Sequence, residues 1–238
     1  MFLRMSTAEK NPKKSEVKNC QACGLRLDNV ICSGPPDVLQ ILDRAKLSSV
    51  YKSGQYIFYS GNQPLGIYLV SKGLVKLEVS TATGHSHTLR IIGPGGILGY
   101  RSLFANEPYQ ASALAMEDVE ICFIPKADMQ LVFKNHPEIV LKFLNILADD
   151  LHQAEKKWMN QMDMGAAERI AEALVFLQDN FQNQEWTRRD IAQWAGTTPE
   201  TVMRTLAQFE KEGLINQSQG RQISILDQDA LKTRYSQN

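Results

Sequence analysis

The four cysteines are the residues whose types and spacing point most directly to chemistry. Cys20 and Cys23 are separated by two residues, Cys32 follows after eight more, and Cys122 lies far along the chain. In a cytosolic chain, clustered cysteines favour metal binding or redox chemistry over a framework of disulfides. A structural zinc site needs the same thiolates. Unmetallated thiols that form a redox-switched disulfide are a further alternative.

The second informative group lies between residues 187 and 213. Thr187 begins a segment that resembles a capping box, with Asp190 in the place of the usual Glu, and Gly196 ends the helix that follows. Thr198 can cap a second helix whose first residue is Pro199. Two short helices joined by a glycine turn are the arrangement that places the second helix in the major groove of DNA.

The second helix also separates a buried stripe from polar residues. Val202, Leu206 and Phe209 form the expected stripe, whereas Glu200 and Arg204 lie outside it. The pattern of segment 214–226 predicts a β-hairpin, or wing, that turns at Gly220. The candidate DNA-binding residues are Thr198, Glu200, Thr201, Met203, Arg204, Arg188, Arg189 and Arg221.

Base recognition follows from the chemistry of three of these side chains. Glu200 can accept a hydrogen bond from cytosine N4 or adenine N6, and Arg204 can donate to guanine O6 and N7. Met203 can contact a thymine methyl group. We expect double-stranded DNA with an inverted repeat, its half-sites about one helical turn apart.

Composition gives no support to DNA binding by itself. The chain has 238 residues and a formal net charge of zero, and from Met164 onward it has eight basic against ten acidic residues. No apolar run is long enough to span a membrane, and the polar start lacks the apolar core of a secretory signal. We therefore expect a cytoplasmic protein without a membrane partner.

The remaining elements must position these residues. Short apolar runs punctuated by glycines between Tyr51 and Lys126 predict the strands of a sandwich or barrel, preceded by a helix over 37–48. A helix over 137–163 follows, with apolar residues at heptad spacing. That seam predicts a homodimer, although a helix packed on its own domain would show a similar stripe. The seam residues are Leu144, Leu147, Leu151 and Trp158.

The segment TRRDIAQWAGTTPETVMRTLAQFEKEGLI resembles the DNA-binding motif of the CRP/FNR superfamily, and SGQYIFYSGNQPLGIYLVSKGLVKL resembles its glycine-punctuated β-roll. The resemblance implies an α+β protein: a cyclic-nucleotide-binding-like β-roll, a long dimerisation helix and a winged helix-turn-helix. It also implies a transcription regulator with RNA polymerase as a partner, and not an enzyme. The expected divisions are 1–34 for a mobile tail and cysteine loop, 35–136 for the β-roll, 137–163 for the dimerisation helix and 164–238 for the DNA-binding domain.

The cysteines are most similar to those of the FNR (fumarate and nitrate reduction) branch, which senses oxygen. Its pattern implies that Cys20, Cys23, Cys32 and Cys122 hold a 4Fe-4S cluster, although the gap before Cys32 is longer than usual in that branch. Cyclic AMP is not expected, because Tyr100 replaces the glutamate that follows Gly99 in cyclic-AMP-binding members and Gln110 replaces their arginine. The alternative is a regulator of the same family that responds to another small ligand, such as a cyclic nucleotide or haem, or that has a structural zinc site.

Overall fold

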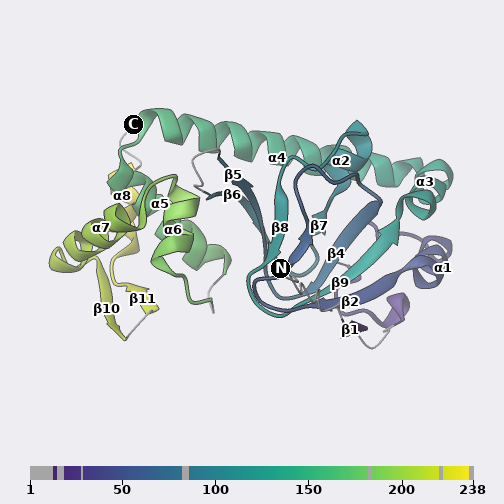
Figure 1. The fold of residues 1–238 in the computed structure, drawn as a ribbon, viewed down its shortest axis with the longest axis horizontal. Helices are drawn as coiled ribbons and strands as arrows, with labels where there is room; N and C mark the ends of the chain where they lie inside the picture. Colours follow the sequence, from purple (N-terminus) through teal and green to yellow (C-terminus); the bar gives the residue numbers. More distant parts are fainter. Residues whose placement is uncertain are drawn as a thin grey trace, which may run out of the picture. The chain divides into compact units, whose positions relative to one another are not determined.

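The computed structural model describes residues 13–14, 19–27, 29–81, 86–181, 184–219 and 222–235. Its elements form two compact units, which Figure 1 shows as ribbons. The first unit spans Met1–Val79 and Arg90–Leu147, and the second spans Ser80–Leu89 and Ala148–Asn238. Among the described residues, no helix is long and apolar enough to cross a membrane.

Two sheets account for the strands between Lys13 and Pro125. The five-stranded sheet has the order β1 (Lys13–Lys14), β2 (Leu47–Tyr51), β9 (Val119–Pro125), β4 (Gly66–Lys72) and β7 (Ile97–Leu98). The four-stranded sheet has the order β3 (Tyr56–Phe58), β8 (Ser112–Ala115), β5 (Val75–Ser80) and β6 (Ser86–Ile92). Phe58, Val70 and Leu98 belong to a buried cluster that joins strands of both sheets.

The β4–β9 pair shows why one glycine is required. Both β2 and β4 pair antiparallel with β9, so β9 is central in its sheet. A Cβ atom added to Gly66 would lie 2.1 Å from the carbonyl oxygen of Ile124. Only glycine allows this close approach of the two backbones.

Helices cover the five-stranded sheet through a second buried cluster. The helical elements before the long helix are η1 (Cys20–Ala22, a 3-10 turn), α1 (Pro36–Ala45), α2 (Tyr100–Ala105) and α3 (Lys126–Asn135). Their apolar residues pack with Ile67 and Ile124 of the sheet, and Phe143 at the centre of this cluster has no exposed surface. Cys20 and Cys32 belong to the same cluster, so the cysteine loop is part of the core of the first unit.

The long helix α4 spans Pro137–Asp163, the same residues as the predicted helix. Figure 1 shows it as one unbroken helix. Leu144, Leu151 and Trp158 are each more than half exposed, whereas Leu147 packs partly against the cluster around Phe143. Three of the four predicted dimer residues are therefore exposed on the surface of the single chain.

The second unit contains the C-terminal elements. They are α5 (Ala166–Asn180), α6 (Arg188–Ala195), α7 (Pro199–Lys211), the antiparallel strands β10 (Ile215–Gln219) and β11 (Gln222–Ile225), and α8 (Gln228–Tyr235). Ile170, Leu177, Ile191 and Leu206 are among its fully buried side chains. The predicted α+β class, with a β-sheet domain, a long helix and a C-terminal helix-turn-helix, is confirmed.

One expectation about local structure needs correction. The helix predicted over 37–48 ends at Ala45, because Leu47 begins β2 and pairs with Phe123 of β9. Helices α2, α3 and α8 were not predicted from the sequence. Arg221, a predicted DNA-binding residue, lies outside the described residues.

Candidate functional site

The first helix of the helix-turn-helix is fixed by its two ends. The Thr187 hydroxyl accepts a hydrogen bond from the Asp190 backbone N–H at 3.1 Å, and the Thr187 N–H donates to the Asp190 carboxylate at 3.2 Å. This reciprocal pair is the capping box predicted from the sequence. At the other end Gly196 has a φ of 63°, a left-handed conformation that favours glycine.

The second helix, α7, begins immediately after this turn. The Thr198 hydroxyl accepts from the Thr201 N–H at 3.3 Å, and Pro199 occupies the first turn, where no backbone donor is needed. Val202, Leu206 and Phe209 are buried, as their spacing predicted. The inner face of α7 is thereby packed against the rest of the second unit.

The opposite face of α7 carries the predicted base-contacting side chains. Glu200, Met203 and Arg204 are all exposed, with Met203 at 54%. The pKa of Glu200 lies below its ordinary value, because its own backbone N–H and the Thr198 hydroxyl donate to the carboxylate. An ionised carboxylate is a hydrogen-bond acceptor only, and an arginine is a donor only. One helix face therefore offers an acceptor and a donor one turn apart.

The other predicted contacts are in different environments. Arg189 and Thr198 are exposed and Thr201 is half-buried. Arg188 is also half-buried, and its guanidinium donates to the Gln217 side chain of β10 at 2.7 Å. Gln217 in turn donates from its backbone N–H to the Glu210 carboxylate of α7 at 2.8 Å. Arg188 therefore helps to hold the wing against the two helices.

The four cysteines come together in the first unit from three parts of the chain. Cys20 lies in η1, Cys23 follows it directly, and Cys32 lies near the start of α1. Cys122 lies on the central strand β9, where Ser48 of β2 is opposite it and its Sγ is 3.8 Å from the Ser48 Oγ. All four are free thiols.

The electrostatics of the thiols show their proximity. Burial raises the pKa of Cys32 to about 12, and Cys20, Cys23 and Cys122 are each near enough to raise it further. Burial also raises the pKa of Cys20 to about 11 and raises that of Cys122. The thiols of Cys20, Cys32 and Cys122 therefore carry protons at neutral pH, and metal binding would have to displace those protons.

The positions of the four cysteine side chains can be compared with the requirements of a metal site. In the described part of the chain, no three His, Cys, Asp or Glu side chains lie close enough together to hold a metal ion. A tetrahedral zinc site needs all four sulfurs at about 2.3 Å from one ion. In a four-iron cluster each thiolate binds a different iron, so the sulfurs stand farther apart. Four neighbouring free thiols are the donor set that either group uses.

Residues that the sequence analysis did not select hold the cysteine loop in place. The Asp43 carboxylate accepts from the Cys20 N–H at 2.7 Å, and the Lys46 ammonium lies 3.2 Å from the Cys20 Sγ. The buried Asn29 side chain accepts from the Cys32 N–H at 3.2 Å and donates to the Gly95 carbonyl at 2.8 Å. Asp43 and Lys46 are 23 and 26 residues from Cys20, and no pattern in the sequence selected them, because lysine and aspartate are ordinarily surface residues.

The cysteine loop also contacts α4. Phe143 and Ile139 of α4 belong to the same buried cluster as Cys20 and Cys32. The Lys142 ammonium donates to the hydroxyl of Ser33 at 3.3 Å. The cysteine loop therefore lies in contact with the helix that carries the predicted dimer residues.

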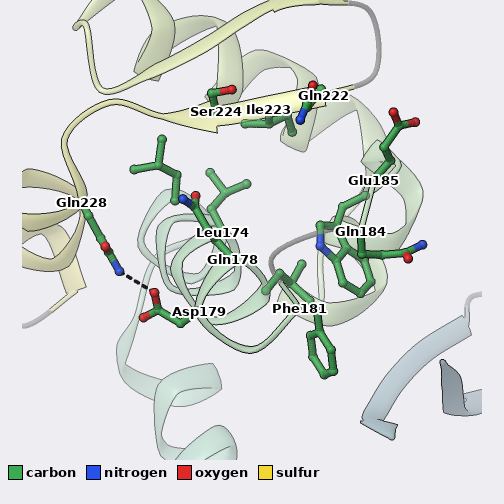
Figure 2. Close-up of a pocket in the computed structure, with 13 residues that line it drawn as sticks. Leu174, Gln178, Asp179, Phe181, Gln184, Glu185, Gln222, Ile223, Ser224 and Gln228 are labelled. Atoms are coloured by element: carbon green, nitrogen blue, oxygen red, sulfur yellow. Dashed lines mark hydrogen bonds between the residues drawn. The ribbon is translucent and has the colours of Figure 1, made fainter. Parts of the chain in front are cut away.

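A surface pocket of about 540 Å³ lies in the second unit, between α5, β11 and α8 (Figure 2). Its described lining contains carboxamides, two carboxylates and several apolar side chains, but no histidine, cysteine or lysine. A 2.8 Å hydrogen bond from Gln228 to Asp179 crosses one side of it. None of the predicted site residues lines this pocket. In its described lining, the two carboxylates are the side chains that could act as a base.

Comparison with known proteins agrees with the division between sheet domain and helix-turn-helix. Residues 49–136 match the cyclic nucleotide-binding domain family, and residues 168–234 match the Crp-like helix-turn-helix domain family. The structure of FixK2 from Bradyrhizobium japonicum superimposes with a TM-score of 0.71 at 22% identity, covering 79% of this chain and 96% of the other.

Two curated relatives cover most of the chain. The cyclic AMP receptor protein of Thermus thermophilus is 30% identical over 187 residues, which is 76% of this chain and 87% of the relative. The anaerobic regulatory protein of Bacillus subtilis is 24% identical over 82% of this chain and 87% of the relative. Together with the matched domains, these similarities show that the chain belongs to the CRP/FNR family of transcription regulators, whose members are not enzymes.

Proposed function

We propose that this regulator binds an inverted repeat in double-stranded DNA as a homodimer, with α7 in the major groove, and that it acts together with RNA polymerase. The observation that carries the proposal is the exposed Glu200–Arg204 pair on a helix whose opposite face is buried. The capped start of α7 supports it, since a helix N-terminus attracts the DNA phosphates.

The chemistry of the exposed side chains on α7 indicates which DNA bases they would contact. Arg204 donates to guanine, Glu200 accepts from cytosine or adenine, and Met203 contacts a thymine methyl group. Arg204→Ala should weaken binding by about 1–3 kcal/mol and remove the preference for guanine at one position of each half-site. Lys211→Ala, at the opposite end of the same helix, is the matched control. Selection from a random DNA pool should give wild-type base preferences for the control, and a retained guanine preference in Arg204→Ala would disprove the assignment.

We further propose that Cys20, Cys23, Cys32 and Cys122 hold a 4Fe-4S cluster. The donor set supports this, because four thiols without a disulfide come from separate parts of the chain and lie close enough to influence one another. Such a cluster would supply an oxygen-labile, redox-active centre. The name of the Bacillus subtilis relative, an anaerobic regulatory protein, is consistent with a response to oxygen.

The residues around the thiols support a route from this site to DNA binding. The cysteine loop packs on Phe143, and Lys142 reaches Ser33, so ordering of the loop by metal would restrain the start of α4. We propose that this restraint favours the dimer that binds DNA. A shift of about 2–3 kcal/mol in the dimer equilibrium would change the occupancy of the active state about 30- to 150-fold.

Cyclic AMP is the alternative ligand suggested by the matched domain and by the Thermus thermophilus relative. Tyr100 argues against it, because this side chain is buried, packs on Phe143 with ring centroids 5.7 Å apart, and accepts from Arg90 at 2.8 Å. The glutamate expected for a ribose hydroxyl is therefore replaced by a packed aromatic ring, and Gln110 is an exposed neutral side chain.

Anaerobic purification tests both hypotheses, the 4Fe-4S cluster and the response to cyclic AMP. Iron, sulfide and zinc are measured together with DNA affinity, before and after exposure to air and with or without cyclic AMP. We expect iron and sulfide in the anaerobic protein, loss of DNA affinity in air, and loss of iron in each single Cys→Ser variant. Zinc alone, or no metal, would refute the cluster. A gain in DNA affinity on addition of cyclic AMP would favour the alternative.

A further inference from the structure

Lys46 is a buried lysine beside the thiols. It follows α1 directly and precedes β2, and its side chain is only 3% exposed. Its ammonium lies 2.8 Å from the Asp43 carboxylate and 3.2 Å from the Cys20 Sγ. The same carboxylate oxygen accepts from the Cys20 N–H at 2.7 Å. Lysine, aspartate and cysteine thus form one compact hydrogen-bonded group.

Burial of a lysine is costly and needs a compensating charge. Asp43 supplies part of it, but that carboxylate is 29% exposed and can interact with solvent as well. The ammonium also lies near enough to act electrostatically on Cys32 and Cys122, so its charge reaches thiols on both the loop and the sheet. Four thiolates around an iron–sulfur core leave a net negative charge in the same buried region, and a nearby cation would stabilise it.

We propose that Lys46 is the positioning residue of the thiol site, donating a hydrogen bond to the Cys20 sulfur and offsetting the negative charge of the metal-bound thiolates. The inference rests on the proposed cluster. Hydrogen bonds to cluster sulfurs and net charge are two of the properties that set cluster potentials, and partners of metal ligands commonly change affinity when they are lost.

Three variants separate charge from packing. Lys46→Met removes the charge and the donor while keeping a long side chain, and Lys46→Gln keeps a donor without the charge. Lys52→Met is the matched control, because Lys52 lies just beyond the other end of β2, where it is 63% exposed and pairs with Asp118. Circular dichroism and thermal melting of the metal-free proteins establish that each variant is folded.

The measurements are cluster retention against an iron chelator and the midpoint potential, both made on the full chain without oxygen. In Lys46→Met we expect half of the iron to be lost at about 10- to 100-fold less chelator, and the potential to become more negative. Lys46→Gln keeps a donor, so it should show a smaller negative shift in potential and a smaller loss of retention, and Lys52→Met should match the wild type.

The outcomes distinguish the two proposals. If the wild type holds iron and sulfide but Lys46→Met retains them equally well at an unchanged potential, the role of Lys46 is refuted and the cluster stands. If the wild type holds no iron and sulfide, both proposals are refuted. Should Lys46→Met fail to fold, the potential of Lys46→Gln decides, and a wild-type potential there refutes the charge role.

Discussion

Lys157 should make the stability of the second unit depend on pH. This lysine of α4 donates to the Thr88 carbonyl at 2.8 Å and lies 3.8 Å from the centre of the Trp194 ring. Burial lowers its pKa from 10.5 to about 8, although the nearby Glu172 carboxylate acts in the opposite direction. The folded protein therefore releases this proton at a lower pH than the unfolded chain does.

The sign follows from the proton count. Below about pH 8 both states hold the proton, and between about pH 8 and 10.5 only the unfolded chain does, so stability rises with pH across that window. At about 1.4 kcal/mol per pH unit, the fall in pKa corresponds to at most about 3 kcal/mol. Lys157→Met removes this contribution, so the stability of the wild type relative to the variant should increase by about that amount from about pH 7 to 10.5.

Tryptophan fluorescence during urea unfolding provides the assay, because Trp158, Trp186 and Trp194 all belong to the second unit. Comparison of the two proteins cancels the cysteines, which titrate in the same range but are present in both. Lys156→Met, at an exposed neighbouring position, is the control and should show a constant difference from the wild type. An equally constant difference for Lys157→Met would refute the argument from burial.

Three further changes test the remaining elements. Leu144→Glu combined with Leu151→Glu should yield monomers by light scattering, since both side chains are exposed on α4, and a dimeric double variant would contradict the predicted seam. Thr187→Ala should destabilise the second unit by about 1 kcal/mol in urea unfolding through loss of the α6 cap, and no loss would show that the cap is dispensable. Gly66→Ala should prevent folding of the first unit by circular dichroism, because its Cβ would lie 2.1 Å from a backbone oxygen; a folded variant would show that β4 and β9 can separate there.

The helix-turn-helix could be predicted because its signals are local. Thr187, Gly196, Thr198 and Pro199 each act on backbone groups within a few residues, so their effect does not depend on the rest of the fold. The buried stripe of α7 follows from helical periodicity in the same way. The hydrogen bond from Arg188 to Gln217 was not predicted, since it joins residues 29 positions apart through the wing.

The surroundings of the thiols could not be predicted from the sequence in the same way. The spacing of Cys20, Cys23 and Cys32 marks a candidate ligand set, but their approach to Cys122 depends on the pairing of β2 with β9. The same pairing ends α1 at Ala45, three residues before the predicted end of that helix, and leaves the Lys46 side chain almost fully buried. Long-range strand pairing overrides local helix propensity at this point.

The chain has no net positive charge, and some acidic side chains of the second unit have partners within that unit. From Met164 onward basic residues do not outnumber acidic ones, so general attraction to phosphates contributes little. Glu212 pairs with Arg234, and Glu210 accepts from Gln217, so part of the acidic charge is used within the second unit. Arg204 and Arg189 remain exposed. The proposed recognition of DNA therefore relies on the placement of a few donors and acceptors on α7 and not on net charge, which is why the motif and its geometry were informative where composition was not.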